Sequence, residues 1–217
     1  MRQESAKQLG HRQSNKWDTG NLLLDDPTQD DRFDFEAIFG NDHPVEIEIG
    51  CGKGTFMLAR AQARPEINML GIEYARAYAA YCADRYHRAG LENVRMLGTD
   101  ADMIFTHCVP ENSLMRVHVY FPDPWPKRRH HRRRLLQRPF VEKVRKALKV
   151  GGQLIMVTDH LGYFLHIRKA IYNAPGYVRT PMPRMTDTDG EIVGTNFERK
   201  YIAQGRPFYS TALMKYA

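Results

Sequence analysis

The sequence predicts one α/β domain built on a mostly parallel β-sheet. Short apolar segments recur from Val45 onward, and helix-like segments separate them. In addition, 42% of the 217 residues are apolar, which is enough to bury a single large core. Parallel strands need a crossover connection, usually a helix, so apolar segments that alternate with helices indicate a parallel sheet.

The expected elements follow one another from residue 45. Segments with the β-branched and aromatic content of buried strands cover residues 45–49, 68–72, 94–97, 115–121 and 153–158. Helices are expected over residues 55–63, 75–89, 101–107, 133–148 and 163–173. Residues 208–216 predict a further strand, antiparallel because no long crossover helix precedes it. Residues 181–200, rich in Thr, Asp and Gly, predict a loop.

The first forty residues differ in texture from the rest. They are polar and irregular, and the first sixteen contain Arg2, Lys7, Arg12 and Lys16 against Glu4. This composition predicts a flexible basic arm over residues 1–40, followed by one domain over residues 41–217.

Composition also excludes several classes. No run of about 18 apolar residues occurs and residues 1–5 lack an apolar signal core, so we expect neither membrane insertion nor secretion but a cytoplasmic protein. The cysteines Cys51, Cys82 and Cys108 are odd in number and lack a metal-ligand spacing. We therefore expect free thiols and no metal site.

Positive charge is concentrated in one segment. The net charge is +7, and residues 127–134 contain six Lys or Arg and no acid, which leaves only +1 for the rest of the chain. Such a patch on a near-neutral body suits binding to a phosphate backbone. The alternative is a solvated helix start or a membrane-surface patch.

An acidic residue lies just before this basic segment. Asp123 stands between Pro122 and Pro124, directly after the strand expected over residues 115–121. Ligands of open α/β sheets bind at the carboxyl ends of the strands. Because each proline fixes its own φ, Asp123 is expected in a stiff loop, which suits a group that takes part in chemistry.

A glycine-rich loop follows the first expected strand. Gly50, Gly52 and Gly54 allow a sharp turn and close approach of a ligand, but their spacing is not that of a dinucleotide site. The alternative is a simple strand-to-helix turn.

Three acids lie at the ends of successive strands around this loop. Glu73 can accept both hydroxyls of a ribose, and Asp100 or a neighbour can meet an adenine amino group. Glu48 can receive an ammonium group or only backbone donors. This layout suits S-adenosylmethionine, whose sulfonium is positive and which carries no phosphate.

With these residues in place, the chain resembles the bacterial tRNA guanine-N7 methyltransferases, from about Val45 to the C-terminus. The resemblance rests on residues 48–54, 71–73, 121–127 with the Arg/His segment after them, 158–159 and 195–198. It implies a Rossmann-like class I methyltransferase fold: a mostly parallel seven-stranded sheet, helices on both faces and an antiparallel C-terminal edge strand.

The resemblance also implies an activity and residue roles. The activity is methyl transfer from S-adenosylmethionine to N7 of a tRNA guanosine, at position 46 of the variable loop. The partner is tRNA, the protein is a monomer or homodimer, and no obligatory protein partner is expected. Asp123 is the implied catalytic residue. The implied cofactor-binding residues are Glu48, Gly50, Gly52, Gly54, Glu73, Asp100 and Asp123; substrate is held by Lys127, Asp159, Thr195, Asn196, Phe197 and Glu198, and RNA by Arg129, His130, His131, Arg132, Arg133 and Arg134.

Guanine chemistry agrees with these roles. N7 is an unprotonated lone pair, so its methylation needs alignment and a negative potential, which Asp123 can supply, rather than a general base. A carboxylate from Glu198 or Asp159 can accept N1–H and the exocyclic amine of guanine. Two alternatives stay open at this point: Trp125 either stacks on a base or packs under the loop, and Asp159 either binds substrate or caps the next helix.

Three other functions compete with this prediction. The first is methylation of another RNA or of a protein. The second is a non-catalytic RNA-binding scaffold on the same fold, which the acids Glu48, Glu73 and Asp123 argue against. The third is nicotinamide binding, which the glycine spacing disfavours.

Overall fold

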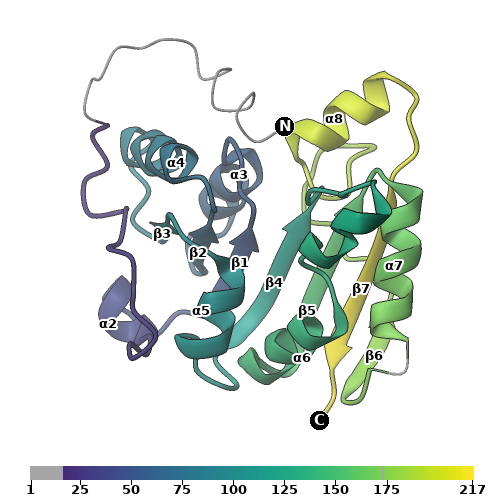
Figure 1. Cartoon of the computed structure of the whole chain (residues 1–217). Coiled ribbons are helices and arrows are strands. Elements are labelled where there is room, and N and C mark those ends of the chain that lie inside the picture. The colour runs from purple at the N-terminus through teal and green to yellow at the C-terminus, as the bar shows by residue number, and fades with distance from the viewer. Residues whose placement is uncertain (1–16, 173) are drawn as a thin grey trace.

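The computed structural model describes residues 17–172 and 174–217. Its centre is a seven-stranded sheet with the strand order β3-β2-β1-β4-β5-β7-β6 (Figure 1). The strands are β1 Val45–Ile49, β2 Asn68–Ile72, β3 Val94–Leu97, β4 Leu114–Tyr120, β5 Leu148–Thr158, β6 Tyr177–Thr180 and β7 Tyr209–Lys215. Strands β1 to β5 are parallel, and β7 runs antiparallel to both of its neighbours.

Helices cover both faces of the sheet and bury two apolar cores. One core lies under α2 Phe35–Phe39, α5 Ala101–His107, α6 Arg138–Ala147 and α7 Leu161–Ile171. The other lies under α3 Thr55–Ala63 and α4 Arg76–Arg88. Helix α8 Asn196–Ala203 and the 3₁₀ helix η1 Arg128–Arg133 lie in connections between strands. Within the described residues, no helix has the length and apolar character needed to cross a bilayer.

The predicted fold class and the first five strands are confirmed, with three corrections. The C-terminal strand β7 is antiparallel as expected, but β6 rather than β7 forms the edge of the sheet. The helix expected over residues 133–148 begins only at Arg138, where Pro139 suits a first turn, and β5 already begins at Leu148. Within the loop expected over residues 181–200, α8 begins at Asn196.

The predicted flexible arm is wrong for residues 17–40; residues 1–16 lie outside the described residues. Leu22 is buried, and its carbonyl accepts a hydrogen bond from the Met96 N–H, while the Leu24 N–H donates to the Met96 carbonyl. The segment thereby covers the outer edge of β3. The physical reason is apolar content: burial of Leu22 and Phe39 offsets the cost of ordering a polar segment.

A buried ion cluster joins β1, β4 and α3 inside the sheet. Both oxygens of Glu46 accept hydrogen bonds from Arg60, at 2.8 and 3.1 Å, and Arg116 and His118 approach the same carboxylate at 2.9 Å. The other ring nitrogen of His118 lies 2.7 Å from the Tyr120 hydroxyl. Burial alone would raise the pKa of Glu46, but His118 and Arg60 reverse the effect and lower it. Glu46 is therefore ionised and fixes the position of β1 against β4.

Removing this carboxylate should destabilise the fold. Glu46→Gln leaves Arg60 and Arg116 without their buried counter-charge, so the free energy of unfolding should fall by about 3–5 kcal/mol in chemical denaturation. Because the folded pKa of Glu46 is lowered, its contribution is present above pH 4.5 and is lost as the pH falls below that value. The variant should therefore lose less stability than the wild type on acidification.

The matched control is Glu66→Gln, which removes an exposed ion pair with Arg64 and should cost less than about 1 kcal/mol. Equal losses in the two variants would contradict the role given to the buried cluster.

Candidate active site

The candidate site lies at the carboxyl ends of the parallel strands, where the strand order changes direction between β1 and β4. This edge receives the loop after β1, Glu73 after β2, Asp100 after β3, Asp123 after β4 and Asp159 after β5. Helix α8 joins them from far along the chain, because the Asn196 side-chain amide donates to Thr55 Oγ1 at 2.7 Å. The fold thus brings the predicted cofactor and substrate segments to one edge.

The glycine loop forms an open cradle. Gly50, Gly52 and Gly54 have φ values of 79°, 55° and 68°, a conformation that favours glycine. A Cβ added at Gly50 or Gly52 would meet no atom within 4 Å, so space is open beside the backbone there. At Gly54 a Cβ would lie 2.2 Å from the Tyr86 hydroxyl, so this glycine is required for packing instead.

Glu73 holds this cradle in position. One carboxylate oxygen accepts the Gly52 N–H and the other accepts the Ala75 N–H, each at 3.0 Å. These two hydrogen bonds tie the carboxylate to the loop after β1 and to the start of α4. Glu73 therefore shapes the loop and lies at its edge.

Glu48 is a buried acid in need of a positive partner. Its side chain is 3% exposed, and its Oε2 has no hydrogen-bond partner among the described residues. Burial raises the pKa of Glu48 to about 8; a hydrogen bond with Cys51 opposes this shift and the charge of Glu73 adds to it. An unsatisfied buried carboxylate next to an open cradle is chemically matched to the ammonium and sulfonium of S-adenosylmethionine.

Backbone strain surrounds the loop after β4. Phe121 and Trp125 have φ values of 50° and 43°, and neither is glycine. Such strain is stored where the surrounding structure enforces it, often at functional sites. Asp123 is exposed between them. Asp100 accepts the Asp102 N–H at 2.7 Å and caps α5, so its carboxylate has a structural role as well as the proposed one.

The basic segment divides into exposed and buried cations. Arg129, Arg132 and Arg133 are exposed and His130 and His131 are half-buried. Arg134 is buried: its Nε donates to the Pro124 carbonyl at 2.8 Å, and its guanidinium lies 4.9 Å from the centre of the Tyr163 ring. The prediction that Arg134 contacts RNA is therefore wrong, because this side chain ties the Asp123 loop to α7.

Trp125 packs under the same segment. Its ring meets His130 edge-on at 5.8 Å, and the Arg133 guanidinium lies 4.9 Å from the ring centre. Trp125 thus packs within the segment, and its stacking on a base stays a prediction.

The two acids predicted to bind the substrate, Glu198 and Asp159, have different environments. Glu198 is fully buried and accepts the N–H groups of Ile192, Val193 and Gly194 at 2.6–2.9 Å. Its oxygens are committed to the loop before α8, so the structure contradicts the idea that they read guanine. The Thr195 hydroxyl likewise caps α8 by accepting the Glu198 N–H at 3.0 Å.

Asp159 is the other acid predicted to bind the substrate. Its Oδ2 lies 3.2 Å from Arg206, and its side chain is 19% exposed. His160, not Asp159, caps α7, so the helix-cap alternative is wrong. Phe197 is half-exposed, and its ring lies 5.9 Å from that of Phe121. Lys127 is exposed at the start of the basic segment.

Sequence reasoning missed two residues of this region. Arg206 holds Asp159, and its guanidinium lies 4.5 Å from the centre of the Tyr201 ring. Burial and the hydrogen bond and charge of Asp159 raise the pKa of Tyr201 to about 12. Both residues lie more than forty positions after Asp159, so no local pattern could have indicated them.

Known proteins agree with this geometry. The model of the family described as "Putative methyltransferase" matches residues 42–211. A tRNA (guanine-N(7)-)-methyltransferase of Vibrio cholerae is 39% identical over 172 residues, 79% of this chain and 70% of the relative. One of Pseudomonas aeruginosa is 40% identical over 191 residues, 85% of this chain and 74% of the relative. The solved structure of the 16S rRNA methyltransferase KamB aligns with a TM-score of 0.60 and 13% identity, over 83% of this chain and 91% of that one.

The fold is thus that of the class I methyltransferases. The chain belongs to the tRNA (guanine-N(7)-)-methyltransferase family.

Neutralising the buried acid should stabilise the ligand-free protein. The folded pKa of Glu48 is raised from 4.5 to about 8, so its contribution to stability is present below pH 4.5 and is lost as the pH rises through 8. Glu48→Gln should therefore be more stable than the wild type at pH 8, by on the order of a few kcal/mol. Denaturant titrations from pH 4.5 to 8 measure this difference.

The control for this experiment is Glu92→Gln at an exposed position. Parallel curves for Glu48→Gln and wild type across that pH range would show that the buried acid does not titrate as described.

Proposed function

We propose that this protein transfers a methyl group from S-adenosylmethionine to N7 of a guanosine in tRNA. The observation that carries the proposal is the open glycine cradle beside the unsatisfied Glu48 carboxylate, at the same sheet edge as Asp123 and the basic segment. When bound, S-adenosylmethionine supplies an electrophilic methyl group on a positively charged sulfur.

Three acids and the cradle would hold the cofactor. Glu48 would accept hydrogen bonds from the ammonium group of the cofactor, which would remove the cost of an unpaired buried oxygen. Glu73 would accept from the ribose hydroxyls while it keeps the Gly52 and Ala75 N–H groups. Asp100 would meet the adenine amino group, and Gly50 and Gly52 would let the ligand approach the backbone.

Asp123 would act by charge and position. N7 of guanine carries a free lone pair, so no residue has to remove a proton before the methyl group is transferred. Positive charge then develops on the purine, and a carboxylate fixed between Pro122 and Pro124 stabilises it without reorganisation. The strained backbone at Phe121 and Trp125 and the buried Arg134 hold that loop in place.

Guanine would be read by Asp159. A carboxylate can accept both N1–H and the 2-amino group, and Glu198 is committed to backbone N–H groups. Arg206 and Tyr201 hold the Asp159 carboxylate from the side. The half-exposed ring of Phe197 offers a surface on which the base can stack.

Exposed cations would bind the tRNA backbone around the target. These are Lys127 and the η1 residues Arg129, Arg132 and Arg133, with His130 and His131 between them. Methylation at the variable loop, a cytoplasmic location and action as a monomer or homodimer without an obligatory protein partner belong to the same proposal.

Nucleoside analysis tests the proposed function. The purified protein is incubated with methyl-labelled S-adenosylmethionine and unmodified tRNA. The tRNA is then digested to nucleosides, which are separated by chromatography and identified by mass spectrometry. Label in N7-methylguanosine supports the proposal. Label in another nucleoside, or tRNA binding without any transfer, would overturn it.

Asp123 should matter for transfer and not for tRNA affinity. Asp123→Ala removes the fixed negative charge, so the single-turnover rate should fall by about 100-fold or more. The dissociation constant for tRNA should change by less than about twofold, because a single acid contributes no phosphate contact. Asp102→Ala, an exposed acid on α5, is the control. A comparable fall in tRNA affinity would refute the role assigned to Asp123.

Asp159 and Arg206 should control the choice of base. Inosine lacks the 2-amino group, so wild type should prefer a guanosine over an inosine target by about tenfold or more. Asp159→Asn should reduce this preference, and Arg206→Ala should reduce it less, because it only frees the carboxylate to move. Lys200→Ala, exposed on α8, should leave it unchanged. Competition between the two substrates measures the ratio, and an unaltered ratio in Asp159→Asn would assign base recognition elsewhere.

A further inference from the structure

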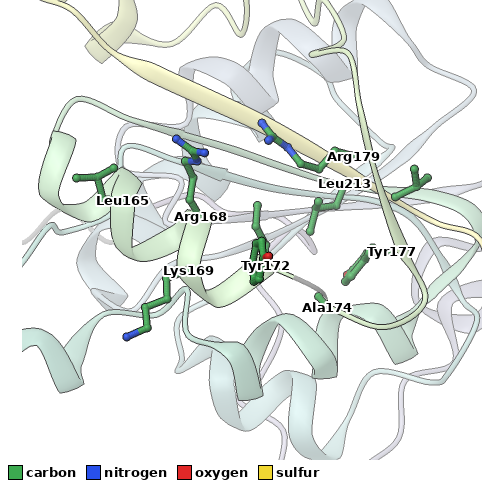
Figure 2. Close-up of a pocket in the computed structure, with 10 residues that line it drawn as sticks. Leu165, Arg168, Lys169, Tyr172, Ala174, Tyr177, Arg179 and Leu213 are labelled. Carbon is green, nitrogen blue, oxygen red and sulfur yellow. The ribbon is translucent and has the colours of Figure 1, made fainter.

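A groove of about 710 Å³ lies on the outer side of α7 and β6, away from the glycine cradle. Its floor is apolar and open: Leu165, Tyr172 and Val178 are 53%, 72% and 43% exposed. Its charged residues are Arg168, Lys169 and Arg179, and no acid lines it. Figure 2 shows the Arg168 and Arg179 side chains extending on the same side of the groove, with Tyr172 between α7 and the β6 region.

The groove adjoins two segments of the chain that contain no acid. Residues 124–141 contain seven Lys or Arg and residues 160–186 contain four, with no Asp or Glu in either. These eleven cations exceed the net charge of +7, so the remaining residues carry −4. The two segments pack together where Arg134 lies over the Tyr163 ring.

His166 on α7 is half-buried near cations of both segments. Burial lowers the pKa of His166, and the positive charges of Arg134 and Lys169 lower it further. A cation just after η1 and one on α7 therefore act on the same side chain. Among the residues that the structure describes, Arg168, Lys169 and Arg179 form no ion pair, so their charges are available to a partner.

The groove is too far from the target base to be part of the base-binding site. Arg168 lies seven residues past the start of α7 beside Asp159, which is about 10 Å along the helix axis. On the sheet, Arg179 pairs with Leu213 of β7, and Thr158, next to Asp159, pairs with Tyr209 of the same strand. Leu213 and Tyr209 are four residues apart, so Arg179 and Thr158 are separated by about 13 Å along the strand direction. Either length corresponds to roughly three or four phosphates along a stacked strand.

We propose that this α7–β6 groove binds the tRNA backbone at a stretch remote from the methylated guanosine. Arg168, Lys169 and Arg179 contact phosphates, and Tyr172 packs against a sugar or base. The proposal rests on the proposed function, since it assumes a tRNA substrate. Charge favours this occupant over a second copy of the chain, because an isologous contact would bring the same cations together.

The test is a triple variant, Arg168→Gln, Lys169→Gln and Arg179→Gln, in the full chain. The slope of log tRNA affinity against log salt concentration should become shallower by about two to three. The KM for tRNA should rise about tenfold or more at moderate salt, with kcat at saturating tRNA and the affinity for S-adenosylmethionine unchanged. A five-nucleotide RNA with a central guanosine, too short to reach the groove, should bind both proteins equally.

A second triple variant, Arg32→Gln, Arg64→Gln and Arg88→Gln, is the matched control. It removes the same charge from exposed positions on other elements and should keep the wild-type salt slope. Thermal unfolding checks that both triple variants are folded.

The outcomes separate the inference from the proposed function. Binding is measured without turnover, so absence of N7-methylguanosine in the wild type counts against the function alone. If the groove variant has the same salt slope and the same KM for tRNA as the wild type, the inference is overturned while the proposed function stands. A wild-type dimer that becomes a monomer in the groove variant, with unchanged tRNA affinity, would likewise overturn it and assign this face to self-association.

Discussion

The ionised Glu46 carboxylate is the interaction on which the rest of the structure depends. It lies inside a fully buried strand and binds Arg60 from α3 and Arg116 and His118 from β4. Strand β1 leads to the glycine cradle and β4 leads to Asp123, so the cluster fixes the two halves of the site relative to each other. A hydrophobic contact would resist separation of the strands but would permit sliding, whereas hydrogen bonds from three side chains define one register.

Within the site, some side chains hold the loops in place and others keep polar atoms available for a ligand. Glu73, Thr195 and Glu198 accept hydrogen bonds from nearby backbone N–H groups, and Arg134 donates one to the Pro124 carbonyl, which keeps three loops in place around the strand ends. Glu48 is the opposite case, with a buried oxygen left unsatisfied. Fixed loops surround this acid, an arrangement in which a bound cationic ligand would supply the missing partner.

Local patterns predicted the frame well and the cross-chain contacts poorly. Strands β1, β2 and β3 match their predicted bounds because apolar runs and glycine loops are local signals. Motif spacing also placed Glu48, Glu73 and Asp123 at one edge. It could not show that Glu198 is consumed by backbone N–H groups, that Arg134 is buried, or that Arg206 holds Asp159, because these depend on the path of the chain after β5. The short strand β6 and residues 17–40 were missed because their apolar residues follow no regular helix or strand period and gain burial only from the finished sheet.

The most direct test of this account is a crystal structure with S-adenosylhomocysteine, the demethylated product of the cofactor. The account predicts that its amino group contacts the Glu48 carboxylate, that its ribose contacts Glu73, and that its backbone-facing side lies against Gly50 and Gly52, with the Asp123 loop beside the sulfur. A ligand bound elsewhere, with the Glu48 oxygen still unsatisfied, would contradict the assignment of the cradle and with it the site described here.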